Sequence, residues 1–332
     1  MTCAALLLGC GDDDVGSQND ASAIADGRVN DATPVAPDSW IALTNVGAGA
    51  VQETAVAELG GLIYVVGGFH AARGIVADVL VYDPLNDRWL ANAPALPAPI
   101  HHAHLVAVGN KLWVVGALTG LDFRAVGVVW SIDPITDKAW AETHTPMPAG
   151  SQRGGGAVGV IDGVIYIAGG LRDGVAVADM SAYETGSDTW NTTLTEIPAA
   201  RDHLVGGVVD DVFYAIGGRD GSVSARVDAY DPTTGMWTPR RDMLTARAGC
   251  AAGVVDGNII VAGGEGSAVD PNGVFPQTES YDPDSDEWTT LSDMRTPRHG
   301  TGGAGYSGRL YVPGGATRQG FGATAVNEAY VR

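Results

Sequence analysis

Basic residues are scarce in this chain. Its 332 residues include 19 Lys and Arg against 39 Asp and Glu, and the only lysines are Lys111 and Lys138, so the net charge is −20. Such an acidic surface repels the phosphates of nucleic acids and of anionic lipids. The composition therefore argues against nucleic acid as a partner, and it leaves a lipid anchor as the only means of attachment to a membrane.

Cysteine is also rare, since only Cys3, Cys10 and Cys250 are present. The segment Leu7-Leu8-Gly9-Cys10 resembles a bacterial lipobox, in which the chain is cut before the cysteine and the cysteine is lipidated. No basic segment precedes it and its apolar part is short, so an incidental Cys10 in a disordered terminus is the alternative. With Cys3 removed and Cys10 acylated, only Cys250 is left, and no disulfide within the chain is possible.

The lipobox-like segment implies a protein of the bacterial cell envelope or the extracellular space, anchored at Cys10. Residues 1–10 would then be the remnant of a signal. Residues 11–38 are rich in Asp, Ser, Asn, Ala and Pro without periodicity, which is typical of a disordered acidic linker. The folded part is expected at residues 39–332.

Long apolar runs are absent, so the sequence predicts no membrane-spanning helix. Short β-branched and aromatic stretches occur instead. Residues 201 to 237 show the pattern most clearly, with a turn at Asp210-Asp211, a strand over 212–216, the pair Gly217-Gly218, and two further strands around a turn at Asp231-Pro232. Four short antiparallel strands make one sheet, and such a sheet needs neighbours of its own kind to bury its faces.

Three markers repeat this unit through the chain with a period near fifty residues. The Trp markers are Trp40, Trp89, Trp140, Trp190, Trp237 and Trp288, at intervals of 49, 51, 50, 47 and 51 residues; the Gly pairs begin at Gly67, Gly169, Gly217, Gly263 and Gly314, with Gly116-Ala117 as a degraded copy; and the Tyr markers are Tyr82, Tyr183, Tyr230, Tyr281 and Tyr330, with Ile132 in the remaining copy. This pattern resembles the kelch repeat. The resemblance covers residues 40 to 332 and implies an all-β, six-bladed β-propeller.

The order of the markers indicates how the ring closes. Trp40 has no Tyr marker before it, and Tyr330 is followed only by Val331 and Arg332. We therefore expect the strand around Trp40 to complete the sheet formed by residues 298 to 332, which leaves the ring without a free edge at the seam.

Arginines recur at one position near the start of four repeats. This position holds Val51, Ile100, Arg153, Arg201, Arg247 and Arg298 in the six repeats. The first strand of a propeller blade lines the central channel, so the arginines are expected at the channel mouth. In kelch proteins that recognise acidic peptides, arginines of this position grip the ligand, and the resemblance implies that role here. In the alternative, each Arg braces the preceding loop through its carbonyl groups.

Further candidates are expected on the same face. His102 stands beside the missing Arg of the second repeat, and Arg219 and Glu265 follow Gly pairs in the fourth and fifth. The neighbouring His101 and His104 suggest zinc, but successive residues of a strand point to opposite faces, so the three histidines do not form one ligand set. No metal and no other cofactor are therefore predicted.

Two functions remain open for this face. The first, which we favour, is a monomeric, non-catalytic binding module that holds an acidic peptide, protein or glycan through bidentate arginine contacts. The second is a sugar-modifying enzyme, since six-bladed kelch propellers include sialic-acid mutarotases; its acid or base would be Glu265, His102 or Asp202. A copper radical oxidase resembling galactose oxidase is disfavoured, because Cys250 has no suitable motif around it.

Overall fold

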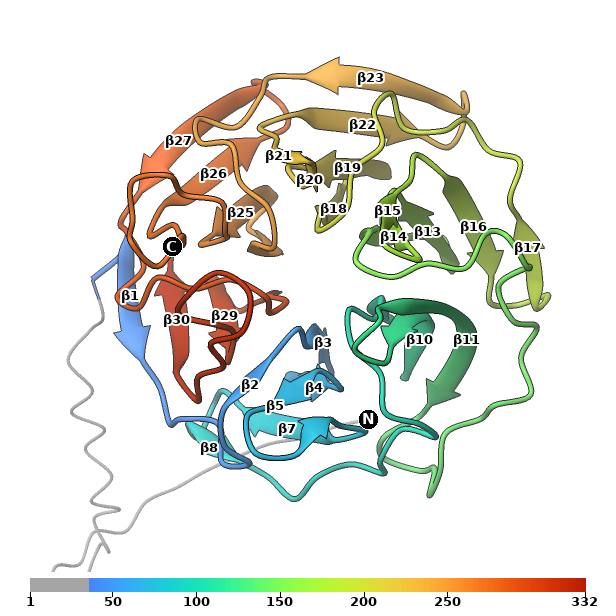
Figure 1. Ribbon diagram of the computed structural model, residues 1–332, viewed down its shortest axis with the longest axis horizontal. Helices are drawn as coiled ribbons and strands as arrows, with labels where there is room; N and C mark the ends of the chain where they lie inside the picture. The colour runs from blue at the N-terminus through green and yellow to red at the C-terminus, as the bar shows by residue number, and fades with distance from the viewer. Residues whose placement is uncertain (1–35) are drawn as a thin grey trace, which may run out of the picture. The chain divides into compact units, whose positions relative to one another are not determined.

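The computed structural model describes residues 36–332 of the chain. Every regular element in this part is a β-strand, and six antiparallel sheets stand around a common axis like the blades of a propeller (Figure 1). The all-β propeller predicted from the repeats is thus confirmed. The lipobox-like segment with Cys10, and the linker as far as residue 35, lie outside the described residues. Among the described residues, no helix is long and apolar enough to cross a membrane.

Each blade is an antiparallel meander. Blades one to three consist of β3 (Ala55–Leu59), β4 (Leu62–Val66), β7 (Val79–Asp83) and β8 (Arg88–Trp89); of β9 (Leu105–Val108), β10 (Lys111–Thr119) and β11 (Arg124–Ile132); and of β12 (Ala157–Ile161), β13 (Val164–Ala168), β16 (Met180–Glu184) and β17 (Thr189–Asn191). Blades four to six consist of β18 (Val205–Val209), β19 (Val212–Ile216), β22 (Val227–Asp231) and β23 (Met236–Arg240); of β24 (Ala251–Val255), β25 (Asn258–Ala262), β26 (Thr278–Asp282) and β27 (Glu287–Leu291); and of β28 (Ala304–Tyr306), β29 (Arg309–Pro313), β30 (Asn327–Val331) and β1 (Ser39–Ala42).

Short strands cover one face of the ring, which is the face toward the viewer in Figure 1. They are β2 (Val51–Gln52), β5 (Phe69–His70) and β6 (Gly74–Ile75) in one small sheet, β14 (Leu171–Arg172) with β15 (Val175–Ala176), and β20 (Arg219–Asp220) with β21 (Ser222–Val223). These strands follow the Gly pairs or lead into the blades, so the segments next to the Gly pairs lie on this face.

Each Trp marker fastens its blade to the preceding one. The six indole Nε1 groups donate to backbone carbonyl oxygens that lie about one repeat earlier around the ring: Trp89 to Thr44 at 3.0 Å, Trp140 to Pro94 at 2.9 Å, Trp190 to Thr145 at 3.0 Å, Trp237 to Thr195 at 2.8 Å, Trp288 to Arg241 at 2.9 Å and Trp40 to Ser292 at 3.0 Å. The marker therefore combines a large apolar contact with a bond to the neighbouring blade.

The N-terminal strand completes blade six. β1 pairs antiparallel with β30 over four residues, and Trp40 lies opposite Tyr330. The two rings lie 5.8 Å apart between centroids, and the Tyr330 hydroxyl donates to Asp38 at 2.8 Å. The first and last strands of the described chain therefore share one sheet, as the order of the markers predicts.

Blade two has three strands where four are predicted. Only a single bridge, between Ser131 and Ala141, forms at the place of the fourth strand. The interval from Ile132 to Trp140 is eight residues, whereas that from Tyr183 to Trp190 in blade three is seven. A shift of one residue reverses the side on which every following side chain points, so continued pairing would take Trp140 away from its place between the blades.

Candidate functional site

The four predicted arginines lie inside the blades. Arg153, Arg201, Arg247 and Arg298 are 0, 2, 0 and 1% exposed. The expectation that they stand free at the channel mouth is therefore corrected. A guanidinium has five donors and no acceptor. Most of these donors meet carbonyl groups, the Ser181 hydroxyl or buried carboxylates of the same blade, but Nε and Nη1 of Arg201 and Nε of Arg247 have no hydrogen-bond partner.

The contacts of Arg298 show how these arginines act. Its Nε donates to Gly314 O at 2.8 Å, and its two terminal nitrogens donate to Thr296 O at 2.8 Å and Val312 O at 2.6 Å. A buried ion pair to Glu328 at 2.6 Å completes the set. The sequence offered as an alternative that each Arg braces the preceding loop; for Arg298 this is observed at Thr296 O, and its other carbonyl partners lie at the end of β29 and in the Gly pair.

The residue two positions after each of these sites forms a ring around the propeller axis. In the order of the blades these residues are Glu53, His102, Gly155, His203, Gly249 and Gly300. Each backbone N–H donates to the carbonyl oxygen of the ring residue in the preceding blade, at 2.7 to 3.2 Å in the five bonds other than that from Glu53 to Gly300. Six amides thus close a circle of hydrogen bonds across all the blades.

All six ring residues have a left-handed backbone, with φ between 50° and 65°. Glycine adopts this conformation at no steric cost, whereas other residues rarely do. Three blades use glycine at the ring, but Glu53, His102 and His203 adopt the same strained conformation with full side chains. Backbone strain of this kind is typical of positions where the side chain has a functional role.

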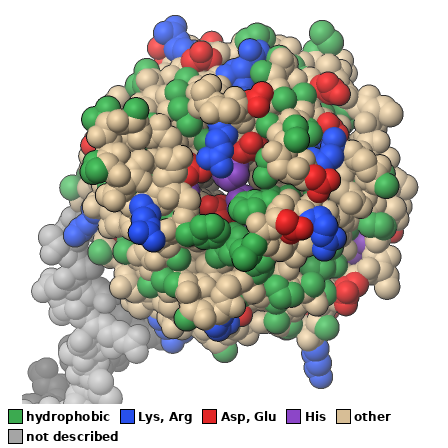
Figure 2. Space-filling view, in the orientation of Figure 1, with side chains coloured by type: hydrophobic (Ala, Val, Ile, Leu, Met, Phe, Trp, Pro, Cys, Tyr) green, Lys and Arg blue, Asp and Glu red, His purple; other side chains and the backbone are tan. Residues whose placement is uncertain are grey.

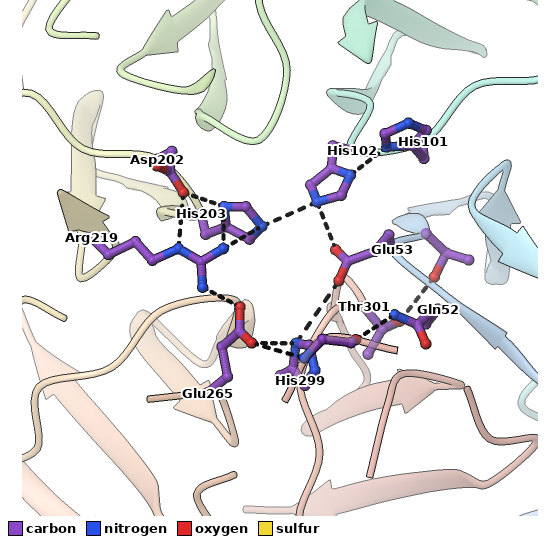
Figure 3. A network of polar contacts seen from close by, with 12 residues as sticks. Gln52, Glu53, His101, His102, Asp202, His203, Arg219, Glu265, His299 and Thr301 are labelled. Carbon is purple, nitrogen blue, oxygen red and sulfur yellow. Dashed lines mark hydrogen bonds and ion pairs between the residues drawn. The ribbon is translucent and has the colours of Figure 1, made fainter. Parts of the chain in front are cut away.

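The three ring side chains converge (Figure 3). One nitrogen from each imidazole and one oxygen of Glu53 all lie within 4.8 Å of one another. The Nε2 atoms of His102 and His203 are 3.1 Å apart, and Nε2 of His102 lies 3.1 Å from Oε2 of Glu53. Three residues that are distant in the sequence thus present donor atoms to one point.

Hydrogen bonds behind the imidazoles determine which nitrogen of each ring carries a proton. Nε2 of His101 donates to the carbonyl oxygen of Gly120 at 2.9 Å, so Nδ1 of a neutral His101 accepts from Nδ1 of His102 at 2.6 Å. Nδ1 of His203 donates to Asp202. Burial, followed by the repulsion from His203, holds the pKa of His102 well below its usual value, so this ring is neutral at pH 7.

A second group of charges borders the ring residues. Arg219, from β20, pairs with Asp202 and with Glu265, and Glu265 lies 3.6 Å from Nδ1 of the buried His299. Burial acts to raise the pKa of Asp202, but the hydrogen bond and charge of His203, together with Arg219, lower it overall. The floor of the site thus holds three carboxylates, those of Glu53, Asp202 and Glu265, against one guanidinium.

A cavity of about 460 Å³ opens above this floor. Figure 2 shows the hollow at the centre of the face, with His and acidic side chains in it and hydrophobic side chains beside it. Phe69, Phe123 and Phe321 line one side; the rings of Phe69 and Phe321 meet edge to face at 5.2 Å. A cavity of this size is typical of a small-molecule site.

A second cavity, of about 280 Å³, runs between the innermost strands on the other side of the ring residues. Its walls include Val56, Leu105 and Val158 together with polar side chains such as Thr54 and Thr301. Glu53, His102 and His203 line both cavities, so these ring residues lie between the mouth and the channel.

Three of the seven predicted ligand-binding residues meet at the mouth, namely His102, Arg219 and Glu265. The sequence analysis overlooked Glu53, His203 and His299. The signal was present, because reading the repeats two positions after the arginines gives Glu or His in three blades and Gly in the others. His101 and His104 do not join His102 as ligands; Nδ1 of His104 donates to Val115 O at 2.8 Å, and its Nε2 accepts from Gly156 N at 3.0 Å.

Family models match most of the described chain. Residues 43–218, more than half of the chain, match the KLHDC2/KLHL20/DRC7 Kelch-repeats domain, and residues 200–244 and 246–295 each match the Kelch motif. The chain belongs to the kelch-repeat family. The resemblance seen in the repeat markers is thereby confirmed, and a kelch-repeat propeller is in general an interaction module.

Individual relatives agree with this assignment. The Kelch-like protein terF of Aspergillus terreus is 33% identical over 324 residues, which cover 90% of this kelch-repeat chain and 69% of that protein. Kelch-like protein 23 of Homo sapiens is 23% identical over 257 residues, covering 76% of this chain and 43% of that protein. The chain thus spans about two thirds of the first relative and less than half of the second.

Among solved structures, YjhT has a similar fold. The two superpose with a TM-score of 0.70 at 16% sequence identity, over 86% of this chain and 95% of YjhT. At this level of identity the similarity concerns the fold and not the site.

Proposed function

We propose that this kelch-repeat protein is a binding module whose cavity at the channel mouth holds a neutral, hydroxyl-rich ligand, such as a free or protein-linked glycan. The observation that carries the proposal is the composition of that cavity. Acceptors from Glu265 and Glu53 and donors from Arg219 lie on its floor, and phenyl rings line one wall. A hydroxyl group both donates and accepts, so it satisfies such a mixed floor.

An acidic ligand was predicted from the four arginines, but the position of these side chains does not favour it. Those arginines are buried in the blades, and the mouth offers Arg219 alone, already paired with two carboxylates. An anion would meet the uncompensated charges of the floor. A neutral ligand avoids this repulsion and still gains the apolar contact with Phe123 and Phe321.

The proposal is tested with a panel of neutral, anionic and cationic mono- and disaccharides, screened by thermal shift and measured by calorimetry. We expect a neutral sugar to bind and Phe123→Ala to weaken its affinity by about tenfold, which corresponds to one lost aromatic contact of about 1.4 kcal/mol. Leu121→Ala is the matched control, since Leu121 is 76% exposed on the same turn. Binding that is unchanged in F123A, or confined to anionic sugars, would contradict the proposal.

Acid–base catalysis on the same ligand is a second candidate. It is favoured by one observation: Asp202, Glu265 and His102, the acid and base candidates predicted from the sequence, all line this one cavity. An enzyme of this kind gives a proton to the ring oxygen of a sugar and takes one from its anomeric hydroxyl group, which opens the ring, and the reverse transfers close it in the other anomeric form. NMR of sugar anomerisation with the wild type and Glu265→Gln distinguishes this function, because a binding module leaves the rate unchanged in both proteins.

A further inference from the structure

Three potential metal-ligand atoms face one another at the floor of the mouth cavity. Nδ1 of His102 and Nδ1 of His203 each donate to a group behind the ring, so Nε2 of each ring is the nitrogen that faces the floor of the cavity. These nitrogens are 3.1 Å apart, and a carboxylate oxygen of Glu53 lies 3.1 Å from the first of them. Such atoms repel one another unless a proton or a metal ion lies between them.

We propose that Glu53, His102 and His203 bind one divalent transition-metal ion of the Zn²⁺ or Fe²⁺ class. Two imidazoles and one carboxylate are a donor set that these ions prefer, with the remaining coordination positions open. For metal–ligand bonds of about 2.0–2.1 Å in a tetrahedral site, neighbouring donor atoms lie roughly 3.3 Å apart. Two of the three distances between the ring donors, both 3.1 Å, are close to this value, and the third is at most 4.8 Å, so Glu53 or His203 has to move slightly toward the ion.

The imidazoles of His102 and His203 have hydrogen-bond partners at Nδ1, as metal-binding histidines usually do. Asp202 holds the imidazole of His203 from its Nδ1 side, and His101 does the same for His102. Partners of this kind orient the ring and keep the coordinating nitrogen unprotonated. The guanidinium of Arg219 does not occupy the position of the ion: it lies 3.2 Å from Nε2 and 3.5 Å from Nδ1 of His203, hence over the face of the ring.

Two independent features support the assignment. The ligands are the three ring residues that keep a left-handed backbone without being glycine, so the strain of the ring is confined to the residues that supply donor atoms. Nearby, His299 is 1% exposed, its Nε2 donates to Arg318 O at 2.9 Å, and its Nδ1 has no hydrogen-bond partner. That nitrogen points into the same floor, 3.9 Å from Glu53, where water on a bound ion would supply the missing donor.

The proposed metal site does not depend on the proposed sugar binding. Its open positions face the cavity of about 460 Å³, so an oxygen of a ligand in that cavity can reach the ion. Either proposal can fail without the other, because the ion is tested without sugar and the sugar is tested in chelator.

The test uses the full chain, stripped with a chelator and titrated with Co²⁺ and Zn²⁺ alone. We expect one ion per chain, visible Co²⁺ absorption bands that Zn²⁺ abolishes, and a loss of measurable binding in His203→Gly. Glycine is the matched replacement, because blades three, five and six have it at this ring position. H203G should therefore unfold at a temperature similar to that of the wild type in chelator, which separates lost ligation from lost folding.

Two further variants complete the design. Asp202→Asn should weaken Zn²⁺ binding by about 10–100-fold, as expected for a residue that positions a ligand. His144→Ala removes a histidine outside the cavity and should leave binding unchanged. The proposal is overturned if no stoichiometric ion binds, if H203G binds as the wild type does, or if ¹⁵N NMR of the stripped protein shows a proton on Nε2 that metal does not displace.

Discussion

Replacing Arg298 by alanine tests the structural role of the buried arginines. The substitution removes four hydrogen bonds and leaves the carboxylate of Glu328, whose side chain is 4% exposed, without its cation. Removing one partner of a buried ion pair costs about 3–5 kcal/mol. The free energy of unfolding of a domain is about 5–15 kcal/mol, so Arg298→Ala should bring the protein near the limit of folding.

Urea denaturation followed by Trp fluorescence measures the effect, since eight tryptophans report on the blades. Arg73→Ala is the matched control: Arg73 pairs with Asp78, but its side chain is 47% exposed. An exposed pair contributes about 0–1 kcal/mol, so this control should unfold almost as the wild type does.

A double variant, Arg298→Ala with Glu328→Ala, separates the ion pair from the carbonyl contacts. It should recover part of the loss, because no unpaired charge then stays buried. If R298A and R73A had equal free energies of unfolding, the arginines would not brace the blades. The structural role assigned to the Arg298 guanidinium, through its bonds to Thr296 O, Val312 O and Gly314 O, would then be refuted.

Two further outcomes follow from the closure of the ring and from Cys250. Deletion of residues 36–46 removes β1 and exposes the edge of β30, so cooperative unfolding should collapse; an unchanged melting temperature would show that β1 does not close the ring. Burial raises the pKa of the Cys250 thiol from 9.0 to about 11, so the thiolate fraction at pH 8 should be about 100-fold lower in the folded protein than in the unfolded one. Iodoacetamide labelling, assigned to the Cys250 peptide by mass spectrometry, should therefore be slow until urea unfolds the chain, and equal rates in both states would contradict the burial.

The repeat markers alone were sufficient to predict the architecture. Trp, Tyr and Gly pairs act locally and in the same way in every copy, so their spacing predicts strands, turns and the number of repeats. The indole bonds to the preceding blade give the physical reason for the Trp period, and the pairing of Trp40 with Tyr330 follows from the order of the markers. The single failure, the fourth strand of blade two, arises from one additional residue before Trp140.

Which side chains meet at the candidate site is determined by the tertiary structure and could not be predicted from the sequence. Whether Arg298 faces a ligand or its own blade depends on how far its side chain reaches from the backbone, which residue type and spacing do not encode. Similarly, Glu53, His102 and His203 are 49 and 101 residues apart in sequence, and only the closed circle of backbone bonds brings them to one axis. A ring closes by contacts between blades, so the chemistry at its centre is determined by the assembly of all six repeats and not by any one of them.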